Sequence, residues 1–221
     1  MKSKRLLCFC AGLLLISLSY SQRTDLGIWY NLSADQKLTR KIDLNIILTL
    51  RTDENASRVE EGFMEGGLSY SLSKYISLAG KYRFTADRRS DGFYGASHKW
   101  FGDLNGFIRP GNFGLSGRLR YQRSYGISPG KENIGYEGSH LRYLAKAVYL
   151  NSALPIDPFI YAEFFDPLDD NCNKTFDKTR LSAGVDYKTR KKNMFEAGYI
   201  LQQNKRNEIF HIISITYNLK F

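Results

Sequence analysis

The sequence contains little cysteine, proline or histidine, and each scarcity excludes a class of protein. There are three cysteines, five prolines and three histidines in 221 residues. Cys8 and Cys10 lie in an N-terminal segment that we expect to be removed, which leaves Cys172 without an intrachain partner. A small disulfide-stapled scaffold is therefore excluded. The shortage of proline excludes Pro-rich linkers and collagen-like chains.

Long apolar runs are also scarce, and the one that stands out is at the N-terminus. Three basic residues come first, an apolar stretch fills 6–18, and Ser19 and Ser21 place small residues before Gln22. This order is typical of a secretory signal. It predicts a signal peptide over residues 1–21, cleaved during export, and a mature domain over 22–221. With a mean hydropathy of -0.38, a bundle of transmembrane helices is not expected.

The rest of the chain is rich in apolar and aromatic residues that alternate with polar ones. Hydrophobic residues make up 43% and aromatic residues 14% of the sequence. Period-two alternation recurs in short segments, and no stretch shows sustained helical periodicity, so we expect an all-β protein. The expected strands are 26–34, 42–51, 63–72, 76–85, 99–108, 113–122, 141–150, 158–165, 181–188, 195–202 and 209–221.

Charge separates two architectures that share this alternation. From residue 42 onward, the apolar faces of these segments hold no Asp, Glu, Lys or Arg. A soluble barrel would turn these faces inward, whereas a membrane barrel turns them toward lipid and keeps its charges inside. Tyrosines on the apolar faces lie mostly toward segment ends, as in interfacial girdles. Long polar loops are expected at 52–61, 86–97, 124–139 and 166–177, with short turns between them.

These features predict a closed antiparallel transmembrane β-barrel of 10–12 strands in an up-and-down meander. Segment 26–34 makes the count odd, while single-chain bacterial barrels normally have even numbers. Either a twelfth strand lies within a loop, or segment 26–34 is not a full strand of the wall.

Charged residues on the opposite faces form the candidate lumen, and the basic ones outnumber the acidic ones. We expect a network of ion pairs that fills a narrow lumen; the alternative is a positive constriction that favours anions. The basic members are Arg51, Lys81, Arg83, Lys99, Arg118, Arg120, Arg142, Lys146, Lys188 and Lys220. The acidic members are Asp43, Glu65, Asp103, Glu163, Asp186 and Glu196.

Two resemblances to known proteins support the prediction of an outer-membrane barrel. Alternating residues that end in Tyr217, Leu219 and Phe221 resemble the C-terminal signal of bacterial outer-membrane barrels, which implies recognition by the barrel assembly machinery. More of the chain is similar to a family of small outer-membrane proteins known as the domain of unknown function 2490 family. The similar pieces are LGIW at 26–29, LRTDENASR at 50–58, YRFT at 82–85, HKWFGDL at 98–104 and LRYQR at 119–123. The resemblance implies a barrel in the outer membrane and no particular activity.

We therefore expect a non-enzymatic outer-membrane barrel with a structural or narrow-pore role, in contact with membrane lipids and not with nucleic acid. The alternative is a barrel enzyme that acts on lipid or lipopolysaccharide, for which His211 on the lipid-facing side is the candidate. No cofactor is expected. Loop 166–177 resembles the opening of a calcium loop, but it has Lys174 where the sharp bend needs glycine and Arg180 where the motif closes with glutamate.

Overall fold

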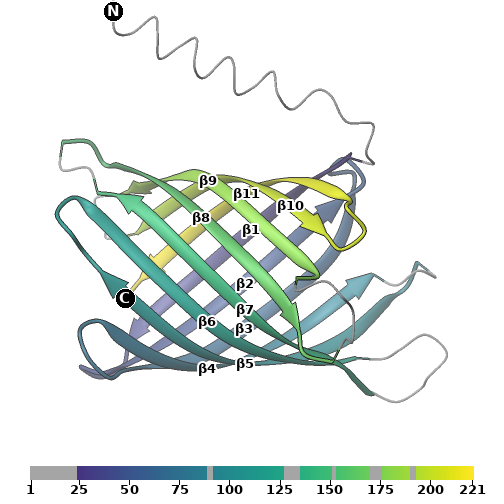
Figure 1. The fold of residues 1–221 in the computed structure, drawn as a ribbon, viewed down its shortest axis with the longest axis horizontal. Coiled ribbons are helices and arrows are strands. Elements are labelled where there is room, and N and C mark those ends of the chain that lie inside the picture. The colour runs from purple at the N-terminus through teal and green to yellow at the C-terminus, as the bar shows by residue number, and fades with distance from the viewer. Residues whose placement is uncertain (1–23, 89–91, 127–134, 151–152, 170–175, 190–192) are drawn as a thin grey trace, which may run out of the picture.

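The computed structural model describes residues 24–88, 92–126, 135–150, 153–169, 176–189 and 193–221. The signal peptide predicted over 1–21 lies outside these residues, as does Cys172. The described part of the chain is all-β and forms eleven strands (Figure 1). They are β1 (Thr24–Lys37), β2 (Ile42–Asp53), β3 (Arg58–Ser71), β4 (Ile76–Arg88), β5 (Tyr94–Ile108), β6 (Phe113–Gly126), β7 (Gly135–Tyr149), β8 (Ile156–Pro167), β9 (Lys178–Lys188), β10 (Met194–Asn204) and β11 (Ile209–Lys220). Among these residues, no helix has the length and hydrophobicity needed to cross a bilayer.

The strands form one closed barrel in which each strand pairs with the next along the chain. All of these neighbours are antiparallel, which confirms the meander, but the closing pair is parallel: β1 runs beside β11, from Thr24 opposite Ile209 to Asp35 opposite Lys220. An odd number of meander strands requires this, because the first and last strands then run in the same direction. Segment 26–34 is thus a full strand, and the described residues hold no twelfth one, so both expected ways to an even count were wrong.

The parallel closure places the start of β1 and the end of β11 at opposite ends of the barrel (Figure 1). The turn end carries the connections β1–β2, β3–β4, β5–β6, β7–β8 and β9–β10 and the C-terminus. The loop end carries the start of β1 and the other connections.

The strands extend further toward the loop end than the hydrophobic alternation predicted. β2 continues to Asp53 and β3 starts at Arg58, so the loop expected over 52–61 shrinks to 54–57. Likewise, β6 reaches Gly126 and β7 starts at Gly135. Backbone pairing needs no apolar side chains, so a hairpin continues where both of its faces have become polar. Alternation therefore marked only the middle of each strand.

The two faces of the wall have the polarity expected from the sequence. Large apolar side chains point outward, and the exposed fractions of Met64, Leu68, Leu104 and Trp100 lie between 45% and 56%. Charged side chains are buried instead, with Glu65 only 1% exposed. The apolar residues thus cover the outside of the barrel.

A smaller apolar cluster fills part of the interior beside the closing strands. Trp29 of β1, Ile200 of β10 and Ile212 of β11 are buried together, with Tyr161 and Phe210 against them. The cluster packs one side of the barrel, and elsewhere in the interior charged side chains lie among buried rings such as Phe101 and Phe165.

Candidate functional site

The charged interior is shown by contacts between strands that are not neighbours. Arg118 Nη2 of β6 donates to Glu163 Oε1 of β8 at 2.7 Å. Lys146 Nζ of β7 donates to Glu196 Oε2 of β10 at 3.1 Å. Strands separated by others in a closed wall can touch only across its inside, so these side chains lie within the barrel.

One half of the network centres on Glu65 of β3. Its Oε2 accepts hydrogen bonds from Arg83 Nη2 at 2.6 Å and Arg83 Nε at 3.0 Å. Its Oε1 lies 3.4 Å from Lys81 Nζ and 3.8 Å from an Arg120 nitrogen. Arg120 also binds Asp103 through two parallel hydrogen bonds of 2.6 Å. Such two-point arginine–carboxylate pairs are strong and geometrically specific.

The other half centres on Glu163 of β8. Arg118 and Arg142 each donate to Glu163 Oε1 at 2.7 Å, while Arg180 Nη1 approaches Oε2 at 3.4 Å. Three guanidinium groups thus share one carboxylate that is 4% exposed. We call the two halves together, Glu65, Lys81, Arg83, Asp103, Arg118, Arg120, Arg142, Glu163 and Arg180, the ion-pair septum.

Aromatic rings inside the barrel stack on Arg51 and on three arginines of the ion-pair septum. Cation–π contacts of this kind stabilise a guanidinium that has lost part of its hydration. The guanidinium-to-centroid distances are 3.8 Å for Arg51 over Trp29, 3.7 Å for Arg83 over Phe63, 4.4 Å for Arg120 over Phe101 and 4.3 Å for Arg142 over Phe165.

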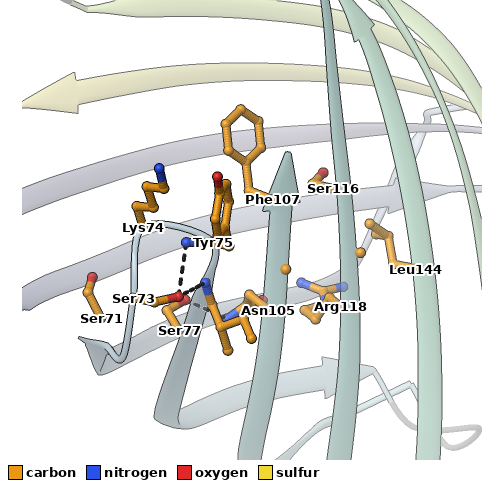
Figure 2. Close-up of a pocket in the computed structure, with 13 residues that line it drawn as sticks. Ser71, Ser73, Lys74, Tyr75, Ser77, Asn105, Phe107, Ser116, Arg118 and Leu144 are labelled. Carbon is orange, nitrogen blue, oxygen red and sulfur yellow. Dashed lines mark hydrogen bonds between the residues drawn. The ribbon is translucent and has the colours of Figure 1, made fainter. Parts of the chain in front are cut away.

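Two cavities flank the ion-pair septum. The turn-end vestibule has a volume of about 350 Å³ and lies among strands β3 to β7 (Figure 2). Lys74, Tyr75 and Phe107 stand at its side, and Asn105 Nδ2 donates to Ser77 Oγ at 3.5 Å within it. The loop-end vestibule has a volume of about 210 Å³ and is more polar. It is lined by Trp29, Arg51, Glu60, Glu61, Arg83, Lys99, Gln122, His140, Arg142, Phe165, Asp177, Lys178, Arg180 and Gln202.

Most of the predicted lumen charges are brought together. Lys146 lies 3.8 Å from Asp186 in addition to its bond with Glu196, and Lys188 pairs with Asp157 at the turn end. Asp43 and Lys99 form no salt bridge with a described residue, and neither does Lys220 at the exposed end of β11. Arg51 pairs with Glu61. The members that share ion pairs are Arg51, Glu65, Lys81, Arg83, Asp103, Arg118, Arg120, Arg142, Lys146, Glu163, Asp186, Lys188 and Glu196.

Several interior charges lie outside the predicted set: Arg180, Lys178, Glu61 and Asp157. Each lies just beyond the end of an expected strand. Continuing the alternation of segment 181–188 backward would have placed Arg180 and Lys178 on the same face as Asp186. The alternation of polar and apolar residues thus continues before Leu181, but the expected strand starts at Leu181 because that is its first apolar residue.

The three histidines lie in two environments. His98 and His211 are on the outer face, where Nδ1 of each is hydrogen-bonded to a tyrosine hydroxyl, from Tyr82 and Tyr199 respectively. His140 is on the inner face, and its Nε2 lies 3.0 Å from Asp177 Oδ2. In the described part of the chain, no serine hydroxyl is hydrogen-bonded to His211, which a serine–histidine catalytic pair would require.

The calcium-like loop is only partly described. Asp169 Oδ2 accepts hydrogen bonds from the Ser139 hydroxyl at 2.8 Å, from the Ser139 backbone N–H and from the Tyr136 hydroxyl. The donors to this oxygen all belong to β7, so it is already hydrogen-bonded within the protein. Residues 170–175 lie outside the described part of the chain. Over the described ranges, no group of three or more His, Cys, Asp or Glu side chains could hold a metal ion.

Comparison with known proteins gives a family and no activity. No curated protein matches the chain. The model of a family described as "Protein of unknown function (DUF2490)" matches residues 26–209, from the third residue of β1 to the first residue of β11. The chain therefore belongs to the DUF2490 family.

Proposed function

We propose that this protein is an outer-membrane β-barrel with a non-enzymatic role, exported with a signal peptide over residues 1–21, whose lumen is closed at mid-height in its resting state. The single observation that carries the proposal is the inverted polarity of the wall, with exposed Leu and Ile outside and buried Arg, Asp and Glu inside. A lipid-facing surface needs this arrangement, because a Lys or Arg on it at the bilayer midplane costs about 2–4 kcal/mol.

Aromatic residues on the outer face support the proposal by their height along the strands. One set, including Tyr70, Phe113 and Tyr149, lies near the turn end, where the last two rings contact each other at 5.5 Å. In a second set, Tyr82 and Trp100, 4.7 Å apart, lie six and eight residues from the turn-end termini of β4 and β5, at Ile76 and Ile108. At about 3.3 Å per residue and a strand tilt of about 40°, the two sets are roughly 15–20 Å apart. This separation suits the two interfaces of a thin apolar layer.

The C-terminal residues fit assembly into such a membrane. Tyr217 is exposed on the outer face of β11 and Phe221 is exposed directly after it, where the Phe221 backbone N–H donates to the Asp35 carbonyl of β1 at 3.0 Å. β11 is the strand that closes the barrel, so before closure its backbone edge toward β1 is unpaired and open to a factor that also reads its outer side chains. This supports recognition by the barrel assembly machinery.

The ion-pair septum supports a structural role or a narrow pore rather than a wide one. Its side chains cross the interior between the two vestibules, and breaking a buried charge pair is costly. A lipid-acting enzyme has less support, since the hydrogen-bond partner of His211 is Tyr199.

Membrane fractionation and gel migration test the proposal. We expect the protein in the outer-membrane fraction, extracted only by detergent, with a folded band that shifts on boiling. In planar bilayers, the purified barrel is expected to show conductance far below that of an open porin. Recovery in the aqueous periplasmic fraction would contradict the membrane assignment, and large steady conductance would contradict the closed lumen.

A further inference from the structure

We infer that the loop-end vestibule binds a small oxyanion, either free in solution or as the terminal phosphate of a larger solute. The inference deepens the proposed function, on which it depends only for the side of the membrane from which the ligand arrives. The binding site itself needs only the folded barrel.

The first argument is the balance of charge in the vestibule. Its basic side chains are Arg51, Arg83, Lys99, Arg142, Lys178 and Arg180, and its acidic ones are Glu60, Glu61 and Asp177. Glu61 is paired with Arg51, and Asp177 with His140. Below the vestibule, Glu65 is paired with Arg83, and Glu163 is already shared by three arginines. The cavity therefore keeps an excess of positive charge, and buried charge without a counter-charge is costly.

The second argument is that donors around the cavity lack acceptors. Arg142 is only 7% exposed, and its Nε has no hydrogen-bond partner among the described residues. The same holds for Arg51 Nε. Lys99 and Lys178 form no salt bridge with any residue that the structure describes. Because native proteins satisfy most of their buried polar groups, a cluster of free donors indicates a missing acceptor.

The shape and chemistry of the cavity narrow the ligand class. A volume of about 210 Å³ corresponds to about seven water molecules, which is room for a phosphate group and a small adjoining part of a larger solute. Guanidinium groups match the oxygen spacing of phosphate and carboxylate. Asp177 Oδ1 is an acceptor without a partner in the described part of the chain, and it could receive a hydroxyl of the ligand. A protonated phosphate supplies such a hydroxyl.

Trp29 provides a reporter for this site. Its ring lies 3.8 Å from the Arg51 guanidinium and 4.8 Å from that of Arg180, so an anion that draws either group away changes the environment of the indole. The sequence has only one other tryptophan, Trp100, on the outer face. Trp100→Phe therefore leaves Trp29 as the sole emitter.

The test uses the full mature chain carrying Trp100→Phe, folded in detergent micelles at low ionic strength. It is titrated with inorganic phosphate, with glucose 1-phosphate and with glucose, and followed by Trp29 emission and calorimetry. We expect saturable binding of a phosphate probe and none of glucose. Lys178→Gln and Lys99→Gln, on different strands, should each weaken binding about tenfold, as expected for loss of a charged hydrogen bond. Lys74→Gln, at the turn-end vestibule, is the matched control and should leave affinity unchanged.

The outcomes separate the two sources of the anion. Equal affinity for phosphate and glucose 1-phosphate would show that a free oxyanion is enough for binding. Binding of glucose 1-phosphate alone would show that the ligand is the phosphate end of a larger solute. If neither probe binds, or if both lysine variants bind as tightly as the parent, the inference is overturned. Because the binding test is made in micelles, its failure would not affect the proposed outer-membrane location. Recovery of the protein in another cell fraction would not affect the binding result.

Discussion

Arg118 and Arg142 donate to the same oxygen of Glu163, each at 2.7 Å, from opposite sides of the ion-pair septum. Arg118 lines the turn-end vestibule and Arg142 the loop-end vestibule. One carboxylate oxygen of Glu163 thus holds an arginine from each vestibule. We therefore expect the blocked lumen to depend more on Glu163 than on any other residue of the ion-pair septum.

Glu163→Gln should therefore be strongly destabilising. It leaves the guanidinium groups of Arg118, Arg142 and Arg180 without their shared negative charge, and loss of one partner of a buried ion pair costs about 3–5 kcal/mol. The free energy of unfolding, from urea titration of the barrel in micelles, measures the effect. Glu54→Gln is the control, since Glu54 pairs with Arg58 on the surface, where such pairs contribute at most about 1 kcal/mol. Equal effects of the two substitutions would show that the septum contributes no more than a surface pair.

Gly184→Ala should also destabilise the barrel, for a steric reason. A Cβ at Gly184 would lie 2.6 Å from Phe159 Cζ and 2.5 Å from the Ala197 carbonyl oxygen. Phe159 is 3% exposed inside the wall and has little room to move, and overpacking typically costs about 1–3 kcal/mol. At Gly106, on the outer face, a Cβ would meet nothing within 4 Å. Gly106→Ala should therefore be tolerated, and unfolding midpoints that fall equally for both variants would contradict this packing.

Ala56→Gly should raise stability, although glycine usually weakens β structure. Glu54, Asn55 and Ala56 all have left-handed backbone conformations in the β2–β3 turn, with φ of 62° at Ala56. Alanine pays about 1–2 kcal/mol there and glycine does not. The turn is held by Asp25, which accepts hydrogen bonds from the Glu54 and Asn55 N–H groups at 3.1 and 2.8 Å. Ala162→Gly within β8 is the control and should lower the unfolding midpoint. If Ala56→Gly also lowers the unfolding midpoint, the backbone of Ala56 is not strained in this turn.

Asp169, just after β8, should lose its hydrogen bonds to β7 only in strong acid. The hydrogen bond from Tyr136, followed by those from Ser139, lowers the pKa of Asp169 below its ordinary value of 3.8. A depressed folded-state pKa means that the contact is fully present above the ordinary value and is lost as pH falls through the lower one. The exchange protection factor of the Ser139 amide should thus stay constant from neutral pH to about 4 and fall below that. Loss of protection near pH 6 would contradict the assignment.

Much of the fold could be predicted because alternation and charge exclusion act on every strand separately. Leu68 and Leu104 were placed outside and Arg120 inside from local sequence alone, and the structure agrees. The parallel closure could not be found this way. It depends on whether segment 26–34 joins the wall, which is decided by its pairing with a strand at the other end of the chain.

The site was harder to predict than the fold. Glu65, Arg83 and Arg120 were identified as interior charges, but their pairing depends on the stagger between strands, which alternation does not report. The loop-end vestibule was missed because Lys178 and Arg180 lie where β9 extends past its apolar core. Polar strand ends look like loops in sequence, and in this barrel they carry the binding chemistry.

The most direct test of the account compares the two tryptophans in lipid bilayers. Trp100 is on the outer face and 56% exposed, whereas Trp29 is inside and 8% exposed. Single-tryptophan variants, Trp29→Phe and Trp100→Phe, are reconstituted in vesicles whose acyl chains carry bromine, which quenches indole emission on contact. We predict strong quenching of Trp100 and little of Trp29. Quenching of Trp100 by water-soluble acrylamide but not by brominated chains would contradict a barrel that faces lipid.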